Sequence, residues 1–278
     1  MDVLSISASQ RDAVLAWLGV PRPTRTRPWL DALLAAYAQR VPWESASRVV
    51  RRSRAGSAEA CVVSPSAFWE AALSRGHGGT CFESNAALAA LLASVRIPSV
   101  LTINDRPPLA ACHTALLVDA DGERLVVDAG FPLYAAVPLP TAGERRVVRT
   151  PWGTFSATAL GPGRYGIDQH PHPRPRAFDL VDRAVPVPAY VAATCADYGA
   201  DGLFLDRVVI KKIVGGDLWR FASGERPWLL ERFRDGVRDT RVLPDGVDDA
   251  AAALAEHFSI DRTTVRDALT HVRPPAGP

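Results

Sequence analysis

Apolar residues in the first third of the chain recur every three or four positions, the spacing that places them on one face of an α-helix. Between residues 28 and 41 they fall at Leu30, Leu33, Leu34 and Tyr37. The segment 64–76 has Ser64 as an N-cap, a proline at the first helical position and Gly76 as its stop. The segment 81–95 again places Leu88, Leu91, Leu92 and Val95 on one face. We therefore predict a mostly helical region over residues 1–96.

From residue 97 the pattern changes to that of β-strands. Short apolar or β-branched runs are separated by turn sequences such as DADGE, 119–123, and GPGR, 161–164. Five or more such strands in succession predict an antiparallel sheet or a small barrel over residues 97–190. Residues 191–278 combine two strand patterns with an apolar helix at 248–258, and the last five residues are typical of a frayed end. The chain thus divides into three expected regions.

Composition narrows the class of protein. Of the 278 residues, 47% are hydrophobic and 22% charged, as in globular proteins with a sizeable core. The formal net charge of +2 gives no electrostatic reason to expect binding to nucleic acid or to an acidic membrane surface. The first residues lack a signal-peptide pattern, and no apolar run is long enough to span a bilayer. Four cysteines without a CxxC pair lead us to expect free thiols in the cytoplasm and no bound metal.

The segment HGGTCFESN, 77–85, contains a candidate nucleophile, Cys81. Gly78 and Gly79 allow a tight turn and the close approach of another molecule. Helix-forming sequence follows the cysteine directly, so the thiol would lie at a helix N-terminus, where unpaired N–H groups and the dipole favour the thiolate. A thiolate is both the nucleophile and the leaving group that acyl transfer needs. A buried cysteine after an ordinary loop would show the same local pattern.

A hairpin supplies the two groups that could activate this thiol. His113 lies early in one predicted strand and Asp128 late in the next, and the turn at 119–123 would set them roughly opposite each other. A carboxylate beside an imidazole fixes its tautomer and stabilises its cation. Taken alone, His113 could be an ordinary strand histidine and Asp128 a strand-end cap. As a set with Cys81, they are the components of an activated thiol nucleophile.

These segments resemble the signature of the arylamine N-acetyltransferases. That signature is RGGxCFExN, then a histidine in an HxxLLV-type strand, then an aspartate in DVGFG. This chain has GGTCFESN at 78–85, HTALLV at 113–118 and DAGF at 128–131. VPWES, 41–45, resembles the family's VPFEN element, and the segments 189–204, 214–221 and 254–260 resemble its C-terminal part. The resemblance covers nearly the whole chain.

The resemblance implies an α+β fold with a papain-like cysteine triad. A helical N-terminal domain, 1–96, would carry Cys81 as nucleophile. An antiparallel β-barrel domain, 97–190, would carry His113 as base and acid and Asp128 as its orienting carboxylate, and residues 191–278 would form an α/β lid. We expect substrate contacts from Gly79, Thr80, Phe82 and Phe131, and structural support near the site from Glu44, His77 and Asn85.

The family's chemistry implies a ping-pong cycle. Acetyl-CoA or another acyl thioester would acylate the cysteine as co-substrate, without a metal, and a small aromatic amine or hydrazine would accept the acyl group. Three alternatives stay open: an amide synthase taking its acyl chain from an acyl-carrier protein to form an amide or macrolactam, a cysteine hydrolase or thioesterase, and an inactive relative that only binds.

The chain departs from the family pattern at three places. His77 replaces the arginine before the two glycines, and Ser45 replaces the asparagine after Glu44. The stretch 97–112 is short where the family carries a pocket-shaping loop, so the shape of the pocket is open. His77 could replace a structural contact, pair with Glu44, or contact the thiol. We expect Cys112, Trp29, Trp43, Trp69 and Trp152 to lie in the core.

Overall fold

The computed structural model describes residues 4–172 and 174–272, and these form eight α-helices and thirteen strands. Five helices precede the first barrel strand: α1 (Ala8–Leu18), α2 (Arg27–Arg40), α3 (Ala46–Arg54), α4 (Pro65–Arg75) and α5 (Cys81–Ser94), with a short 3-10 helix at Glu59–Cys61. As predicted, the Ser64 side chain caps α4 and Gly76 ends it in the left-handed conformation. Helix α5 is buried along nearly its whole length in the apolar core between the other helices and strand β3.

The middle of the chain forms an eight-stranded antiparallel sheet that curls into a nearly closed barrel. Its order is β5-β4-β3-β2-β9-β8-β7-β6, and β5 at one edge contacts β6 and β7 at the other. The strands are β2 (Val100–Arg106), β3 (Leu109–Ala120), β4 (Glu123–Val127), β5 (Val137–Pro138), β6 (Arg145–Thr150), β7 (Gly153–Gly161), β8 (Arg164–His170) and β9 (Arg176–Val181). Apolar side chains from alternate positions of these strands fill the interior.

The last part of the chain adds a second sheet and three helices. The sheet has the order β1-β10-β11-β12-β13, with strands β1 (Trp43–Glu44), β10 (Val209–Val214), β11 (Asp217–Ala222), β12 (Leu229–Arg234) and β13 (Val237–Val242). Helix α6 (Val187–Asp197) precedes it, and α7 (Val247–Phe258) and α8 (Arg262–His271) follow. Sequence periodicity missed the helices α3, α6 and α8 and the strands β1, β5, β6, β9, β12 and β13. In β13 every residue is exposed, so no alternation of apolar and polar positions marks it.

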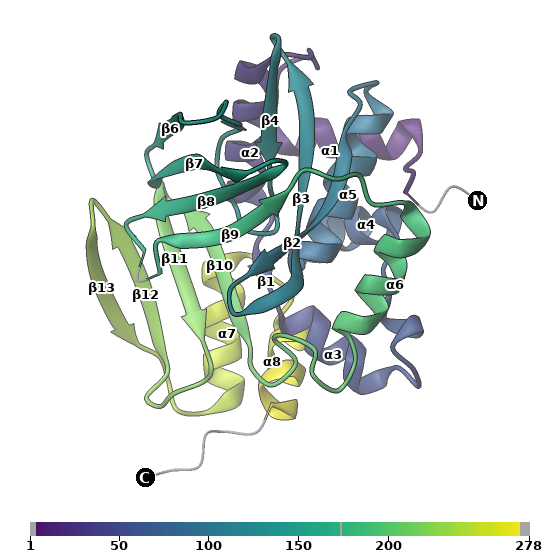
Figure 1. Ribbon diagram of the computed structural model, residues 1–278. Helices are drawn as coiled ribbons and strands as arrows, with labels where there is room; N and C mark the ends of the chain where they lie inside the picture. The colour runs from purple at the N-terminus through teal and green to yellow at the C-terminus, as the bar shows by residue number, and fades with distance from the viewer. Residues whose placement is uncertain (1–3, 173, 273–278) are drawn as a thin grey trace.

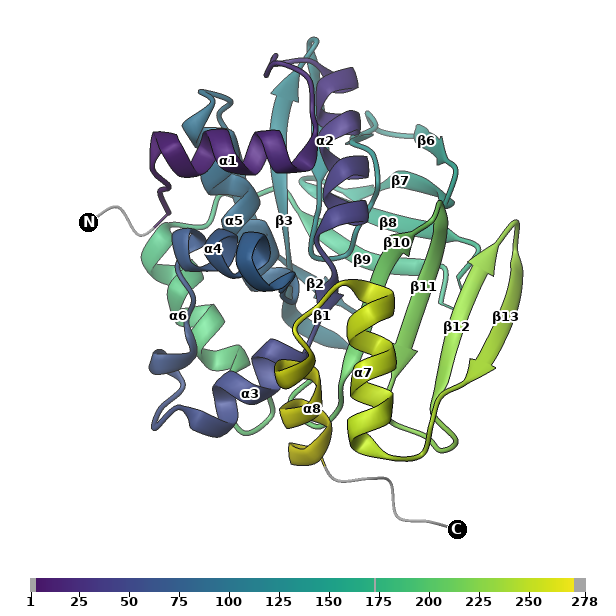
Figure 2. The same cartoon turned by 180° about the vertical axis from the view of Figure 1, so that it is seen from behind.

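The two sheets and the helices surround the start of α5. Helices α1, α4 and α5 lie together on one side, and the barrel lies on the other (Figure 1). Seen from behind, α7 lies against the C-terminal sheet beside β10, and α8 packs next to α7 and α3 (Figure 2). Strand β1, from the first predicted region, pairs with β10 of the third. The boundaries of the three domains therefore stay a prediction. The helical, barrel and α/β composition of the fold is as expected.

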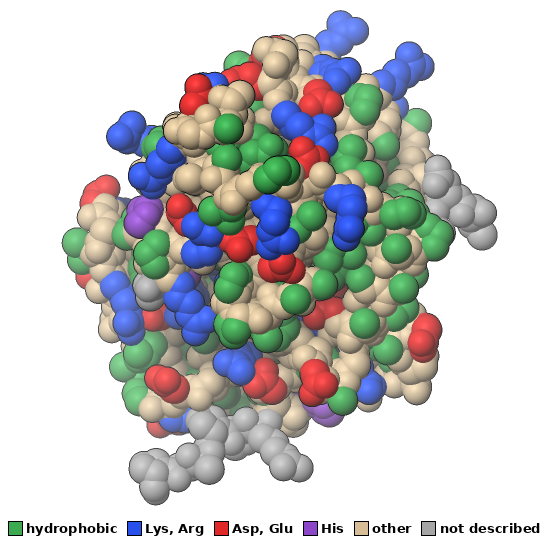
Figure 3. All heavy atoms as spheres, in the orientation of Figure 1, with side chains coloured by type: hydrophobic (Ala, Val, Ile, Leu, Met, Phe, Trp, Pro, Cys, Tyr) green, Lys and Arg blue, Asp and Glu red, His purple; other side chains and the backbone are tan. Residues whose placement is uncertain are grey.

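Charged groups of both signs share the surface. Figure 3 shows Lys and Arg side chains interspersed with Asp and Glu over one face of the molecule. Within the described part of the chain, no helix is both long and apolar enough to cross a membrane. The end of the chain that was expected to fray lies outside the described residues.

Candidate active site

The thiol of Cys81 stands at the first residue of helix α5, as the sequence indicated. Thr80 is the N-cap, and the carboxylate of Glu83 accepts hydrogen bonds from its backbone N–H (3.1 Å) and its hydroxyl (2.7 Å). This is the carboxylate half of a capping box, which fixes where the helix begins. Cys81 itself is half-buried, and its Sγ lies 3.8 Å from the carbonyl oxygen of Cys112. The thiol therefore lies beside the backbone that leads into His113.

His113 and Asp128 form a buried pair. Nε2 of His113 lies 2.7 Å from Oδ2 of Asp128, and the side chains are 3% and 0% exposed. The prediction set the two residues roughly opposite each other. They are not directly opposite, because β3 and β4 pair Leu116 with Val127. That register is two residues away from the expected one, so the two residues lie diagonally on the same face of the hairpin. A shift by two preserves the face, and the pair still forms.

Asn85 connects this pair to the helix that carries the thiol. Its side-chain Nδ2 donates to Oδ1 of Asp128 (2.9 Å) and to the carbonyl of Thr114 (2.7 Å), while its Oδ1 accepts from the backbone of Ala129 (3.0 Å). Asn85 lies one turn after Cys81 on the same buried face of α5. The orientation of the carboxylate is thereby tied to the position of the helix start.

Two residues that the sequence reasoning did not single out complete the junction. The hydroxyl of Thr114, next to His113, donates to the carbonyl of Cys81 at 3.0 Å. A Cβ added to Gly130 would lie 2.3 Å from Cα of Cys81 and 2.5 Å from its Cβ, so only glycine fits there. A threonine next to His113, and a glycine directly after the Asp-Ala pair, were the available signals.

The electrostatics of the site oppose a thiolate that stands alone. Burial raises the pKa of the Cys81 thiol well above its ordinary value, and the negative charges of Asp197, Glu83 and Asp128 raise it further, while Arg48 lowers it. These influences act against the helix start, whose N–H groups and dipole were expected to favour the thiolate. Because the surrounding charge is mostly negative, formation of the thiolate at this position requires a cation close by.

A charged network lies beneath the helix start. The buried guanidinium of Arg48 lies 3.4 Å from Oε1 of Glu83 and 2.8 Å from Oδ2 of Asp197, and the hydroxyl of Tyr198 donates to Glu83. Although burial raises it, Arg48 and Arg51 lower the pKa of Glu83 to about 2. Burial raises the pKa of Asp197 to about 6. Arg48 thus keeps the capping carboxylate charged inside the protein.

The three residues expected as support near the site divide between two places. Asn85 belongs to the site. Glu44 accepts a hydrogen bond from the backbone N–H of Gly78 at 3.2 Å, and Nε2 of the buried His77 lies 3.0 Å from the hydroxyl of Thr264 on helix α8. His77 therefore joins the glycine loop to the C-terminal helices, and burial lowers its pKa. Of the three roles considered for His77, the hydrogen bond to Thr264 corresponds to a structural contact.

Of the four residues expected to contact substrate, one has an accessible ring beside His113. Phe131 is half-buried, and its ring centroid lies 6.3 Å from that of His113. Gly79 and Thr80 are buried in the capped loop, and Phe82 is 1% exposed with its ring against Tyr190. Trp29 and Trp69 lie in the core as expected. Cys112, Trp43 and Trp152 are only half-buried, although Trp152 packs against the apolar core of the barrel.

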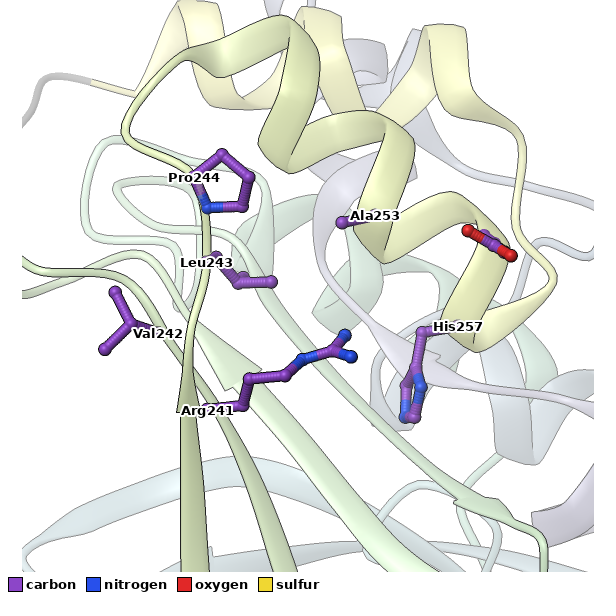
Figure 4. Close-up of a pocket in the computed structure, with 7 residues that line it drawn as sticks. Arg241, Val242, Leu243, Pro244, Ala253 and His257 are labelled. Carbon is purple, nitrogen blue, oxygen red and sulfur yellow. The ribbon is translucent and has the colours of Figure 1, made fainter.

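Large surface cavities lie away from this junction. One of about 620 Å³ lies between Arg241–Pro244, where β13 ends, and His257 on helix α7, with the Arg241 side chain pointing toward the helix (Figure 4). A second, of about 420 Å³, is lined by His77, Gly78 and residues of α3 and α4. Neither is lined by Cys81, His113 or Asp128. The hydrogen-bonded residues, and not the volume of a cavity, therefore locate the candidate site.

Comparison with known proteins agrees with the geometry. A family model described as N-acetyltransferase matches residues 28–172, more than half of the chain. No curated protein sequence matches the chain. The chain belongs to the arylamine N-acetyltransferase family, whose members are acyltransferases.

Solved structures of that family share the fold. Arylamine N-acetyltransferase from Salmonella typhimurium is 18% identical, with a TM-score of 0.78 over 95% of this chain and 99% of that one. The Mycobacterium marinum enzyme, solved in complex with CoA, is 17% identical, with a TM-score of 0.77 over 94% and 98%. A Bacillus cereus enzyme with a Cys-His-Glu catalytic triad is 17% identical, with a TM-score of 0.72 over 92% and 100%.

Proposed function

We propose that this chain transfers an acetyl or other short acyl group from coenzyme A to an arylamine or hydrazine, through an acyl-enzyme on Cys81. The observation that carries the proposal is the linked arrangement of Cys81, Asn85 and the His113–Asp128 pair. One helix positions both the nucleophile and the amide that orients the carboxylate. Membership of the family and the CoA named for the M. marinum enzyme support the choice of donor.

In the first half-reaction, His113 takes the proton of the thiol. Its Nε2 is bound to Asp128, so Nδ1 is the nitrogen that receives this proton. The resulting imidazolium is the nearby cation that the buried thiolate requires, and Asp128 stabilises it. The thiolate attacks the carbonyl carbon of the thioester. The carbon–sulfur bond to coenzyme A then breaks, and coenzyme A leaves as a thiol with the proton from His113.

In the second half-reaction, the neutral amine attacks the acyl carbon on Cys81. His113 takes a proton from the amine nitrogen as the new carbon–nitrogen bond forms, and Cys81 leaves as a thiolate. The proton on His113 then returns to the sulfur, which regenerates the starting enzyme. Aromatic amines suit this step because their nitrogen is mostly unprotonated at neutral pH.

The proposal also includes a cytoplasmic location for the protein. All four of its cysteines are free in the structure.

The test separates the two half-reactions. The protein is exposed briefly to acetyl-CoA, freed of excess donor, and its intact mass is followed with and without an arylamine; Cys81→Ser is the control. A single acetyl adduct that is absent from the variant, persists in water and is discharged by the amine is expected. Rapid loss of the adduct in water would instead indicate a hydrolase. An adduct formed only from an acyl-carrier protein would indicate an amide synthase.

A further inference from the structure

The outer edge of the C-terminal sheet is open. Strand β13 pairs with β12 on one side only, and Figure 1 and Figure 2 show no other element beyond it. All six of its residues are exposed. The unpaired N–H and C=O groups of an edge strand invite another strand, and many edges are therefore blunted by a proline, a lysine or a bulge. Strand β13 has none of these three features.

The turn before β13 fixes which of its backbone groups point outward. Asp235 and Gly236 join β12 to β13, and both have positive φ, 51° and 78°, as in a type I′ hairpin turn. In such a turn the flanking pair, Arg234 and Val237, is hydrogen-bonded, and hydrogen-bonded and non-hydrogen-bonded pairs then alternate along the ladder. Every second residue of β13 therefore points its N–H and C=O groups away from β12. These residues are Arg238, Thr240 and Val242.

The charges of β13 are complementary to those of a second copy of the strand. Asp239 and Arg241 lie on the face toward helix α7, because Arg241 pairs with the buried Leu230 and its side chain points toward that helix (Figure 4). In a two-fold interface the same patch is used by both copies. With Thr240 of both copies at the two-fold axis, each Asp239 would lie directly opposite Arg241 of the other copy. The outward-pointing residues would then meet each other, so that all their N–H and C=O groups pair.

Neighbouring registers are excluded by charge or by the ladder. A shift by two residues in one direction sets Asp239 opposite Asp239, and a shift by two in the other sets Arg241 opposite Arg241. Like charges directly opposite destabilise an antiparallel pair, whereas opposite charges and a Thr–Thr pair stabilise it. A shift by one residue sets outward-pointing backbone groups against inward-pointing ones, so the hydrogen bonds are lost. The strand therefore specifies one register with its own copy.

The same register covers the apolar side chains that β13 exposes. Val242 and Val237 are 63% and 59% exposed, the highest values among the large apolar residues that the structure describes. Val242 would lie opposite Arg238 of the second copy, whose aliphatic stem would cover it. Val237 would lie opposite Leu243 of the second copy, which lines the cavity of about 620 Å³ beside helix α7. Each copy would thus place an exposed valine at a cavity of the other.

We propose that two copies of this chain associate through β13, with Thr240 at the two-fold axis, and join their C-terminal sheets. Each sheet has five strands, so the joined sheet has ten. The partner is a second copy because this one strand carries both members of the complementary pair, Asp239 and Arg241. The interface lies away from the candidate active site, since β1, which bridges to Gly79, is at the opposite edge of the sheet. The inference does not depend on the proposed function.

The mass of the protein in solution tests the proposal. We expect sedimentation equilibrium to give a mass that approaches twice that of one chain as the concentration rises. Asp239→Arg and Arg241→Asp each turn two attractive pairs into repulsive ones, so each should weaken self-association by about 10- to 100-fold. An equimolar mixture of the two variants should associate as the wild type does, because every charge pair across the mixed interface is again opposite in sign.

Two further variants control for folding and for net charge. Thr240→Pro removes an outward N–H that β12 does not use, so the chain should fold and stay a monomer. Arg238→Gln removes a charge from the same strand, but on the opposite face and across from Val242, so it should keep the wild-type association. Circular dichroism should show the wild-type fold in each variant.

Three results would overturn the proposal. One is a wild type that stays a monomer up to about 100 μM. Another is a dimer that survives Thr240→Pro and both charge reversals, because such a dimer uses a different surface. The third is a mixture of Asp239→Arg and Arg241→Asp that fails to associate while the wild type is a dimer, since the strands are then not paired about Thr240.

Discussion

Replacement of Gly130 by alanine should impair catalysis by moving the nucleophile. The added Cβ would lie 2.3 Å from Cα of Cys81 and 2.7 Å from Nδ2 of Asn85. Carbon atoms pack favourably at about 3.5–4.0 Å, so the helix start and the loop must separate by more than about 1 Å. A displacement of about 1 Å at a reacting group can cost about 100-fold in rate. We therefore expect the rate of acyl-enzyme formation in Gly130→Ala to fall by about 100-fold.

The assay is the rate of acetylation of Cys81 by a thioester, followed by intact mass, together with urea unfolding. Overpacking of this kind lowers the free energy of unfolding by about 1–3 kcal/mol, which would leave most molecules folded. Gly56→Ala is the matched control, because nothing lies within 4 Å of a Cβ at that position. Wild-type acetylation by a folded Gly130→Ala protein would refute the close approach of the loop to Cys81.

Three further predictions concern the groups that hold the site. In Asn85→Ala, the buried carboxylate of Asp128 and the backbone N–H of Ala129 lose their hydrogen bonds to the amide. The free energy of unfolding in urea should therefore fall by about 2–5 kcal/mol, and acylation of Cys81 should slow. An unchanged unfolding midpoint would contradict this. Arg48→Met should cost about 3–5 kcal/mol by the same assay, because it leaves the carboxylate of Glu83 buried without its ion pair, and a neutral result would count against that network. Because the pKa of Glu83 is lowered to about 2, its contribution to stability is complete above its ordinary value of about 4.3 and is lost as the pH falls toward 2. The difference in unfolding free energy between the wild type and Glu83→Gln should therefore narrow over that range, and a constant difference would exclude this linkage.

The sequence predicted the elements that local signals mark. Ser64 and Gly76 bound a helix because capping and the left-handed C-terminus are local requirements, and both occur as predicted. The start of α5 at Cys81 follows from the same kind of signal. Strand β13 was missed, because an edge strand exposed on both faces has no hydrophobic alternation. The family signature, rather than periodicity, identified the fold as a whole.

The sequence predicted which residues form the candidate site, but it did not predict the charges that surround the thiol. Cys81, His113 and Asp128 were chosen from residue types and spacing, and the His–Asp pair forms despite a register shifted by two. The effects of burial and of the charges of Asp197 and Glu83, which raise the pKa of the thiol, were not predicted, because these residues come from segments whose proximity only the tertiary structure shows.

The measurement that most directly tests the activation of the thiol by His113 is the pH dependence of alkylation at Cys81 in the wild type and in His113→Asn. Iodoacetamide labelling is followed by the mass of the peptide that contains Cys81, with the Cys112 peptide of the same digest as an internal reference. We predict that the wild type reacts well below the ordinary thiol pKa of about 8.5, through its imidazolium-paired thiolate. The variant should lose that reactivity and label only above the ordinary range. An identical, low-pH profile in both proteins would show that the helix start activates the thiol by itself, and would contradict the role of His113 as its activating base.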